Sequence, residues 1–494
     1  MNNAPICPDC DSVNESSAVV CATCGRQLIV IPTWVRPGSP KKLLRRNRIV
    51  LWPLIGLIIA VFTWFNYPYI PNLIVVIFNS PTSDLSSSWY PGSWPMRGGD
   101  LSGSGYVPWT GEYPEGVRSN SFYLGPSTRS APIISNGTIY LGSESEVSAI
   151  DAETGKPIWT IGQTGPVHGT LAIADETVFV PLRNKELLAI SASSGIVQWS
   201  FKSGSPFVGA PSVDNGIVYS STQKGRVHAL DAATGSPIWT MDAGDAIAPA
   251  VALVNDKIAI GVSSGGLFIK DARTGDKRSR VRIGGLVNHP PVVGGNSVYL
   301  VSNGKVLSFD VNSRELPWSY PLRLVWTQLW LWQLPVPTPP VPAGFQWQAI
   351  PAEGGIEPST NAGDHFEPKP LVPLTFENSL IITPNQGSAF VTAPAATSNA
   401  IYIGSNNNFI YSISADSGKT LWRYRTSSTP VARPTVVGER LYFGTSNGTL
   451  HSVNRVNGQG EWSLELGSPL TAPITFASGI LYARTEDGTL HKIR

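Results

Sequence analysis

The phrase ALDAATGSPIW at residues 229–239 returns along most of this chain in similar form. Its closing tryptophan, Trp239, follows Trp199 and Trp159 at a constant spacing of 40 residues. A fixed period in this range indicates stacked supersecondary units. The related phrases are AIDAETGKPIW (149–159), AISASSGIVQW (189–199), SFDVNSRELPW (308–318), SISADSGKTLW (412–422) and SVNRVNGQGEW (452–462), which end in Trp159, Trp199, Trp318, Trp422 and Trp462. Most of the chain therefore builds a repetitive frame, and we expect individual chemistry where the repeat is broken.

One repeat contains the parts of a small antiparallel sheet. An apolar opening, GAPSV (209–213), is followed by the turn DNG and by the alternating stretch IVYSST (217–222). The turn QKG leads into RVHALDA (226–232), and a Thr-Gly turn leads into the strand that ends in tryptophan. Four short strands with three tight turns make one blade, which cannot bury both of its faces alone. The blades must therefore stack around an axis.

The second strand of the repeat occurs eight times, so the sequence predicts an all-β fold, an eight-bladed β-propeller of four-stranded antiparallel blades over residues 116–494. The eight copies are IYLGS (139–143), VFVPL (178–182), VYSST (218–222), IAIGV (258–262), VYLVS (298–302), IYIGS (401–405), LYFGT (441–445) and LYART (481–485). The last copy stops before its tryptophan strand. Residues 116–125 (GVRSNSFYLG) lie before the first full repeat. We expect them to complete blade eight, because a closed ring has no exposed sheet edge.

All four cysteines of the chain fall in the first 30 residues, as two CxxC pairs: Cys7, Cys10, Cys21 and Cys24. Two such knuckles close a tetrahedral site of four thiolates, which leaves no open position, so the sequence predicts a structural zinc ion. The stretch resembles the short zinc ribbons at the start of many prokaryotic membrane proteins, with Asp11 where that family has glycine. The alternatives are unligated thiols or redox pairs.

A membrane segment is predicted next. Residues 31–48 form a linker that ends in the basic run KKLLRRNR (41–48), and residues 49–70 begin with seventeen uncharged residues, long enough for a transmembrane helix. Because the positive charges lie on the N-terminal side, the ribbon should be cytoplasmic and the propeller extracytoplasmic. Residues 71–115 are predicted to be a Ser/Gly/Pro-rich tether. The segment starts too far along the chain for a signal peptide, and a net charge of +2 gives no indication of nucleic-acid binding.

The closing tryptophan after [DS]-x-x-[TS]-G resembles the tryptophan-docking motif of the pyrroloquinoline-quinone-type propellers. The resemblance covers about residues 94–494 and includes the opening WPMRGGDLSGSG (94–105). It implies that each indole lies over the preceding blade and donates its N–H to a main-chain carbonyl. Blade four (DARTGDKRSRVRI, 271–283) has no tryptophan, so one dock should be missing.

The family includes dehydrogenases that hold the quinone and calcium in the axial channel, so catalysis has to be weighed. The predicted rim positions contain no Asp or Glu, and adjacent cysteines are absent from the whole propeller. We therefore expect a non-enzyme without bound quinone. Several polar rim residues could instead hold an anionic ligand, or simply be solvated: Arg129, His168, Asn288, His289 and Arg433. His228, His451 and His491 recur at one repeat position and are predicted to be structural.

An insertion of about 321–385 separates blades five and six. Its Trp326, Trp330 and Trp332 are a candidate partner site if exposed, or the core of a lid if they pack on the propeller. The leading functional hypothesis is a single-pass membrane protein whose extracytoplasmic propeller binds or scaffolds an unknown protein, as in the non-catalytic propellers that assist outer-membrane protein assembly. The alternatives are a pyrroloquinoline-quinone-dependent dehydrogenase and a transmembrane sensor that relays to the zinc ribbon.

Overall fold

The structure is a computed structural model of the 494-residue chain. It describes residues 6–7, 9–15, 18, 20–26, 28, 55–57, 73–125, 130–162, 165–248, 250–282, 285–312, 380–382 and 388–494. The chain divides into two compact units, Met1–Phe65 and Asn66–Arg494. All of the described strands belong to the second unit, which is the propeller.

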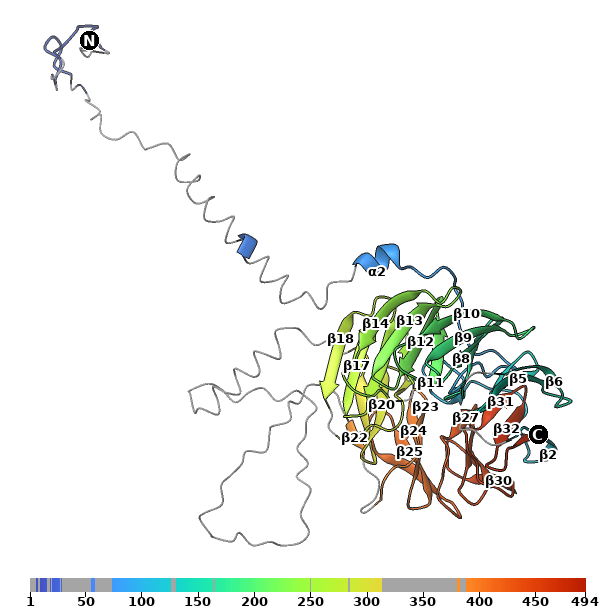
Figure 1. Cartoon of the computed structure of the whole chain (residues 1–494). Coiled ribbons are helices and arrows are strands. Elements are labelled where there is room, and N and C mark those ends of the chain that lie inside the picture. Colours follow the sequence, from blue (N-terminus) through green and yellow to red (C-terminus); the bar gives the residue numbers. More distant parts are fainter. Residues whose placement is uncertain are drawn as a thin grey trace, which may run out of the picture. The chain divides into compact units, whose positions relative to one another are not determined.

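Eight antiparallel sheets follow one another around an axis (Figure 1). Blades one to four are β3 (Ile133–Ser135), β4 (Thr138–Gly142), β5 (Glu146–Asp151), β6 (Pro157–Gly162); β7 (Ala172–Ala174), β8 (Thr177–Pro181), β9 (Glu186–Ser191), β10 (Val197–Lys202); β11 (Phe207–Asp214), β12 (Ile217–Thr222), β13 (Arg226–Asp231), β14 (Pro237–Asp242); and β15 (Ala252–Val254), β16 (Lys257–Val262), β17 (Gly266–Asp271), β18 (Lys277–Arg282). Blades five to eight are β19 (Val292–Gly294), β20 (Ser297–Ser302), β21 (Lys305–Asp310), β22 (Leu380–Ile382); β23 (Ala395–Ala396), β24 (Ala400–Ser405), β25 (Phe409–Ser414), β26 (Thr420–Arg425); β27 (Thr435–Val437), β28 (Arg440–Gly444), β29 (Thr449–Asn454), β30 (Gly460–Glu465); and β31 (Thr475–Ala477), β32 (Ile480–Arg484), β33 (Thr489–Ile493) with β2 (Arg118–Tyr123). The predicted eight-bladed propeller is confirmed.

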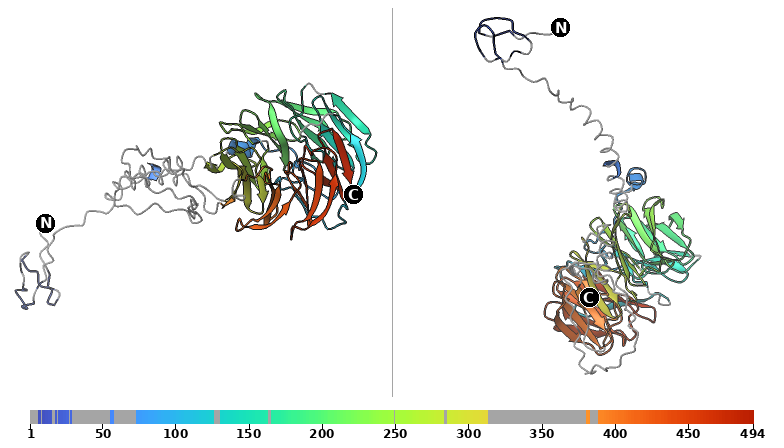
Figure 2. Two further views of the ribbon diagram at one scale, coloured as in Figure 1. Left: turned by 90° about the horizontal axis from the view of Figure 1, so that it is seen from below. Right: turned by 90° about the vertical axis from the view of Figure 1, so that its left-hand side faces the viewer.

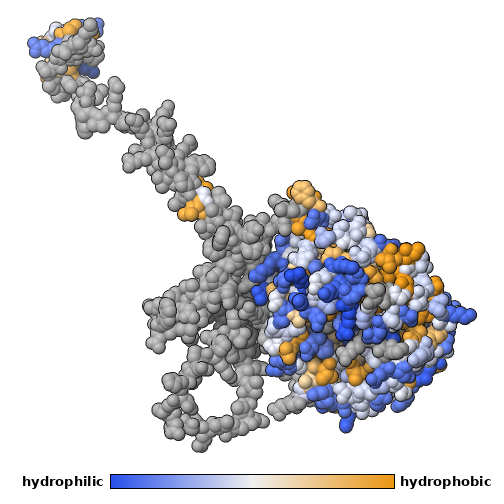
Figure 3. Space-filling model, in the orientation of Figure 1, coloured by the Kyte–Doolittle hydropathy of each residue, from blue (hydrophilic) through white to orange (hydrophobic). Residues whose placement is uncertain are grey.

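The first strand of each blade lies nearest the axis, because first strands of neighbouring blades contact one another: β3 with β7 and β31, β15 with β19, and β19 with β23. The middle strands are almost wholly buried, whereas outer strands such as β10 alternate between half-buried and exposed residues. The core is therefore made between blades, where apolar side chains of adjacent sheets meet. On the face shown in Figure 3, blue and pale residues surround smaller orange patches.

The ring closes as the sequence predicts. β2, from the N-terminal side of the first repeat, is the outer strand of blade eight and pairs with β33 from the C-terminus. Val117 and Arg494 then exchange two backbone hydrogen bonds of 2.8 Å. The red C-terminal strands lie beside the cyan strands of blade one in Figure 1, and Figure 2 shows the ring from two further sides.

Each described tryptophan dock joins a blade to the next one, so the implied direction, toward the preceding blade, was wrong. The indole N–H groups donate to main-chain carbonyls at 2.8–3.0 Å: Trp159 to Ala192, Trp199 to Ala232, Trp239 to Ala272, Trp422 to Arg455 and Trp462 to Pro114. The indole lies flat on the turn glycine of that next blade. At Gly235, whose φ is +74°, a Cβ would stand 2.6 Å from Trp199, so only glycine fits there.

Two junctions depart from this pattern. In blade four, Ser279 stands opposite Ile269, at the register where Trp239 faces Ala229 in blade three. At the closure between blades eight and one, the Nζ of buried Lys492 donates to Ala152 O at 3.0 Å. A lysine there takes the place of an indole.

Blade five differs from the expected strand order. The sequence predicts a fourth strand that ends at Trp318, before the insertion. In the structure β21 pairs with β22, which lies near the far end of the predicted insertion. Trp318 and most of the insertion, with Trp326, Trp330 and Trp332, lie outside the described residues.

The predicted tether packs on the propeller over its described part. In the helix α2 (Leu73–Phe78), Val75 joins the apolar cluster of blades three and four, and Asn79 donates to Ile238 O at 3.1 Å. Strand β1 (Tyr106–Val107) adds to blade seven in parallel with β27. Of the predicted transmembrane segment 49–70, only residues 55–57 are described, and no helix in the described part of the chain has the length and apolarity to cross a membrane.

Candidate binding sites

The N-terminal unit contains two turns of the same construction. In the first, the N–H of Asp11 donates to Cys7 O at 2.9 Å, and in the second the N–H of Gly25 donates to Cys21 O at 2.9 Å. Both residues that follow the CxxC pairs have positive φ, +52° at Asp11 and +78° at Gly25. Asp11 thus adopts the left-handed conformation that glycine has in the second turn, which aspartate tolerates better than most residues.

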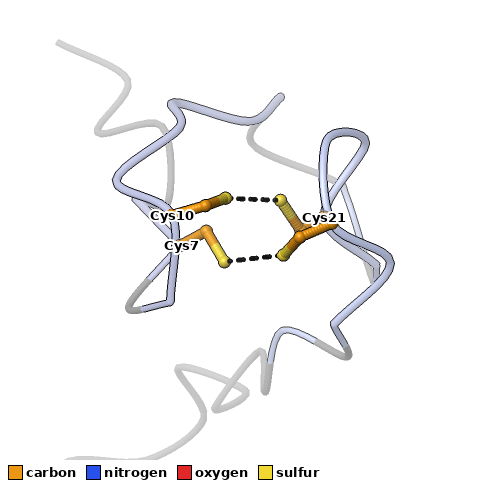
Figure 4. Close-up of side chains that lie close together, drawn as sticks. Cys7, Cys10 and Cys21 are labelled. Carbon is orange, nitrogen blue, oxygen red and sulfur yellow. Dashed lines mark hydrogen bonds between the residues drawn. The ribbon is translucent and has the colours of Figure 1, made fainter.

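The four sulfur atoms face one another between these turns (Figure 4). Cys7 Sγ lies 3.6 Å from Cys24 Sγ, Cys10 Sγ lies 3.6 Å from Cys21 Sγ, and all four atoms are within 4.8 Å of one another. Zinc–sulfur bonds of about 2.3 Å in a tetrahedron place sulfur atoms roughly 3.8 Å apart, so the cluster has the dimensions of a zinc site. The Ser12 hydroxyl lies 3.1 Å from both Cys10 and Cys21 and lowers the pKa of each thiol, in the case of Cys21 to about 5.

Residues 94–107, which we call the hub segment, run through a series of turns along the first strands of the blades and end in β1. Its backbone bonds in turn to the first strands of six blades: Trp94 with Ile134, Pro95 with Ile173, Leu101 with Leu253, Ser102 with Val293, Ser104 with Ala396 and Gly105 with Val436. The glycines of RGGDLSGSG allow the chain to curl tightly within this segment, since the N–H of Gly105 donates back to Gly98 O at 3.0 Å. The segment brings two charged residues, Arg97 and Asp100, to the hub.

Arg433, two residues before β27, packs against the hub segment. Its Nη1 donates to Gly103 O at 2.7 Å, and the side chain is only 3% exposed. Its Nε and Nη2 have no partner among the described residues. Burial lowers the pKa of Arg433 to about 10, partly offset by the negative charge of Asp100.

The hub charges influence one another. Asp100 accepts from the N–H and the hydroxyl of Ser104, and burial raises its pKa to about 6 against those hydrogen bonds and the charge of Arg433. Burial and the nearby Arg97 lower the pKa of His289 to about 4, so this ring is neutral at pH 7. Arg97 and Asp100 retain partial exposure, although both are largely surrounded by protein.

The predicted rim residues that the structure describes have different charged neighbours. Arg433 and His289 are linked electrostatically through Arg97. Burial and the charge of Arg183 lower the pKa of His168, and the charge of Glu144 partly offsets this effect. Asn288 is exposed, and Arg129 lies outside the described residues. The expectation that the axis has no carboxylate is corrected by Asp100. Sequence reasoning missed Arg97 and Asp100 because it took rim positions from the repeats alone, although the charged pair in the glycine-rich stretch 97–105 was a visible signal.

A groove of about 1170 Å³ lies at the seam between blades seven and eight. The chain that enters β2 forms one wall, with Trp109 and Tyr113, and blade seven supplies Trp462 and Arg440. The wall is held in place: Trp109 packs edge-on against Phe476 with ring centroids 5.0 Å apart, and the Arg440 guanidinium lies 5.4 Å above the Tyr113 ring. Arg440 also forms an ion pair with Glu461. Glu112, Glu115 and Arg494 complete the lining.

Eight four-stranded blades, indole docks onto turn glycines and a ring closed by the two ends of the repeat define a pyrroloquinoline-quinone-type β-propeller. The chain belongs to the family of the outer membrane protein assembly factor BamB, which matches residues 143–331 and 365–494. No protein with a curated description matches the chain significantly.

Solved structures of BamB and of two dehydrogenases are similar to this one. BamB from Moraxella catarrhalis is 16% identical with a TM-score of 0.53, over 76% of this chain and 97% of that chain. Quinohemoprotein alcohol dehydrogenase from Comamonas testosteroni is 12% identical with a TM-score of 0.57, over 86% and 82%. A europium-containing methanol dehydrogenase is 15% identical with a TM-score of 0.52, over 80% and 90%. At these identities the likeness establishes the shared fold.

Proposed function

We propose that this protein is a membrane-anchored, extracytoplasmic scaffold whose propeller binds a protein partner. Membership of the BamB family supports a scaffold or protein-binding module. The observation that carries the proposal is the seam groove. It presents Trp109, Tyr113 and Trp462 between charged side chains of both signs. Aromatic and arginine side chains in a preorganised concavity are the residues that dominate protein–protein binding energies.

Charge reversal at the groove rim tests this site. Glu112 and Glu115 are exposed, so replacing both with lysine should leave the fold intact while reversing two of the negative charges that line the groove. Glu153→Lys, on an exposed turn of blade one, is the matched control. Cross-linking in native membranes followed by purification in mild detergent should recover a partner with the wild type and the control, and not with the double variant. If the wild type, the control and the double variant all recover the partner equally, the groove is not the binding site.

The insertion is the second proposed contact region, through Trp326, Trp330 and Trp332. Deletion of residues 322–342 should reduce partner recovery in the same cross-linking assay. Because the groove and the insertion are separate parts of the chain, the two variants distinguish one contact region from the other.

Membrane anchoring is proposed from the sequence of residues 41–70, in which a basic run precedes an uncharged apolar stretch. The full chain should remain in the membrane after alkaline carbonate extraction, and removal of residues 1–72 should release the propeller. Protease added from outside should reach the propeller and spare a tag placed before Cys7. Protection of the propeller instead would reverse the proposed topology.

Zinc in the cysteine cluster and a non-catalytic propeller complete the proposal. The four thiolates would hold the ion, and its binding energy would fold a segment whose described residues bury only a small apolar cluster. For the propeller we propose no quinone-dependent dehydrogenase activity. Dye reduction with added pyrroloquinoline quinone and calcium, measured with a broad panel of alcohols and sugars, should give no signal above the apo protein. Turnover of any substrate in that assay would show that the protein is an enzyme and would contradict the proposal of a non-catalytic propeller.

A further inference from the structure

Arg433 offers a bidentate donor edge that the described residues do not use. Its Nη1 is engaged by Gly103 O, whereas Nε and Nη2 have no described partner. These two nitrogens lie on one edge of the planar guanidinium, and an N–H bond of each points in the same direction within that plane. That edge matches the spacing of two oxygens on a carboxylate or a phosphate.

The edge is buried, so leaving it empty is costly. At 3% exposure, Arg433 has almost no contact with bulk water. A buried donor without a partner loses the hydrogen bonds that it makes with water in the unfolded chain, and the loss is greater when the donor carries charge. Glycine at 105 keeps side-chain atoms away from this edge, because a Cβ there would stand 3.3 Å from Arg433 Nε.

The charges around the hub also favour an anion. Arg97 and Arg433 repel each other, which contributes to a lowered pKa of Arg97, and Arg97 likewise disfavours protonation of His289. Asp100 is the acidic group acting on Arg433, but its carboxylate is bonded to Ser104 and forms no described ion pair with the guanidinium. Two arginines facing one carboxylate leave a surplus positive charge in a poorly solvated place.

We propose that the hub is a binding site for a small oxyanion, held bidentately by Nε and Nη2 of Arg433, with Arg97 as the second cation. A carboxylate of a small organic acid and inorganic phosphate share the required chemistry. The bound anion would tie the hub segment to blade seven, because Arg433 also holds Gly103. The inference is independent of partner binding at the seam groove.

The test measures binding to the detergent-purified full chain by calorimetry and by thermal unfolding, with inorganic phosphate and succinate as separate probes and chloride as the ionic-strength control. Saturable binding of either probe, with a raised unfolding temperature, is expected. Arg433→Lys keeps the charge but loses the fork and should weaken binding at least about tenfold, and Arg433→Gln should abolish it. Arg423→Gln, at an exposed site of blade six, should bind as the wild type does.

Arg97→Gln is a second variant that leaves the buried fork in place, and it should weaken binding while the protein stays folded. The probe that binds more tightly, phosphate or succinate, identifies the ligand as a phosphate or a carboxylate. Absence of saturable binding of both probes to the wild type overturns the proposal and assigns the unpaired donors to buried water. Binding that is equally tight in the wild type and in both Arg433 variants would also overturn the proposal.

Discussion

At the residue scale, the repeated histidines show how one position can be used in different ways. His491 in blade eight lies 2.9 Å from the Ser121 hydroxyl and 3.2 Å from that of Thr485, so it links β33 to the closing strand. His451 in blade seven has no described partner at either ring nitrogen and instead stacks on Phe443, with centroids 5.1 Å apart. Blade four has Phe268 at the same register, opposite Arg280 as His451 is opposite Ser463.

The variant His451→Phe should therefore flatten the acid sensitivity of the propeller. Burial lowers the pKa of His451 to about 4, whereas an unfolded chain has a histidine pKa of about 6.5. As pH falls from 6.5 to 4, the unfolded chain binds a proton that the folded chain does not, so stability decreases. Removing this group should reduce the slope of unfolding free energy against pH by at most about 1.4 kcal/mol per pH unit.

Denaturant titrations between pH 4 and 7 measure that slope, and His491→Phe is the comparison. It also removes a titrating ring but loses the bonds to Ser121 and Thr485, so it should cost about 1–2 kcal/mol at pH 7 as well. A slope unchanged by His451→Phe would mean that, between pH 4 and 6.5, this ring binds a proton in the folded propeller as readily as it does in the unfolded chain.

At the scale of the blade, the indole dock is the joint between neighbouring sheets. Trp239 Nε1 donates to Ala272 O at 2.9 Å, and the Tyr219 hydroxyl of the same blade donates to that carbonyl at 3.0 Å. Trp239→Phe should cost about 1–2 kcal/mol, from one lost hydrogen bond and lost contact with the turn of blade four. The Tyr219 bond limits the loss, because the carbonyl keeps a partner. Chemical denaturation at pH 7 measures the difference.

Ser279 is the natural contrast, since it occupies the dock position of blade four. Its hydroxyl is buried and has no partner among the described residues. Ser279→Ala should therefore leave stability unchanged or raise it slightly. If Ser279→Ala were as costly as Trp239→Phe, the dock would not be the source of the difference between the two junctions.

The blades could be predicted from sequence because the same local signals recur along the chain: turn glycines and an alternating strand in every repeat, and a closing tryptophan in most of them. Prediction from these signals fails where the repeat is interrupted. β22 carries no tryptophan and follows a long insertion, so periodicity could not place it in blade five. The direction of the docks depends on how neighbouring sheets stack, which a local phrase does not encode. Arg97 and Asp100 lie outside the repeat, and only the path of the hub segment brings them beside Arg433.

At the scale of the whole molecule, the chain combines two compact units with different sources of stability. The propeller has a large apolar core in every inter-blade layer, whereas among the described residues of the N-terminal unit the buried apolar cluster consists of Cys7, Cys21 and Leu28, with Ala18 packed against it. A core of that size cannot offset the conformational entropy of ordering the turns. The N-terminal unit should therefore depend on metal and the propeller should not.

Metal removal separates the two units experimentally. The purified chain should contain one zinc ion per molecule, and Cys21→Ser should lose it. Ser12→Ala, which removes a hydroxyl 3.1 Å from both Cys10 and Cys21, should retain zinc with affinity reduced about tenfold. A strong chelator should increase protease cleavage within residues 1–30 and leave the thermal unfolding of the propeller unchanged, because the described apolar cluster around the cysteines contains no propeller residue. A propeller transition that shifts on chelation would show that metal binding and propeller stability are coupled, and would favour the sensor over the scaffold.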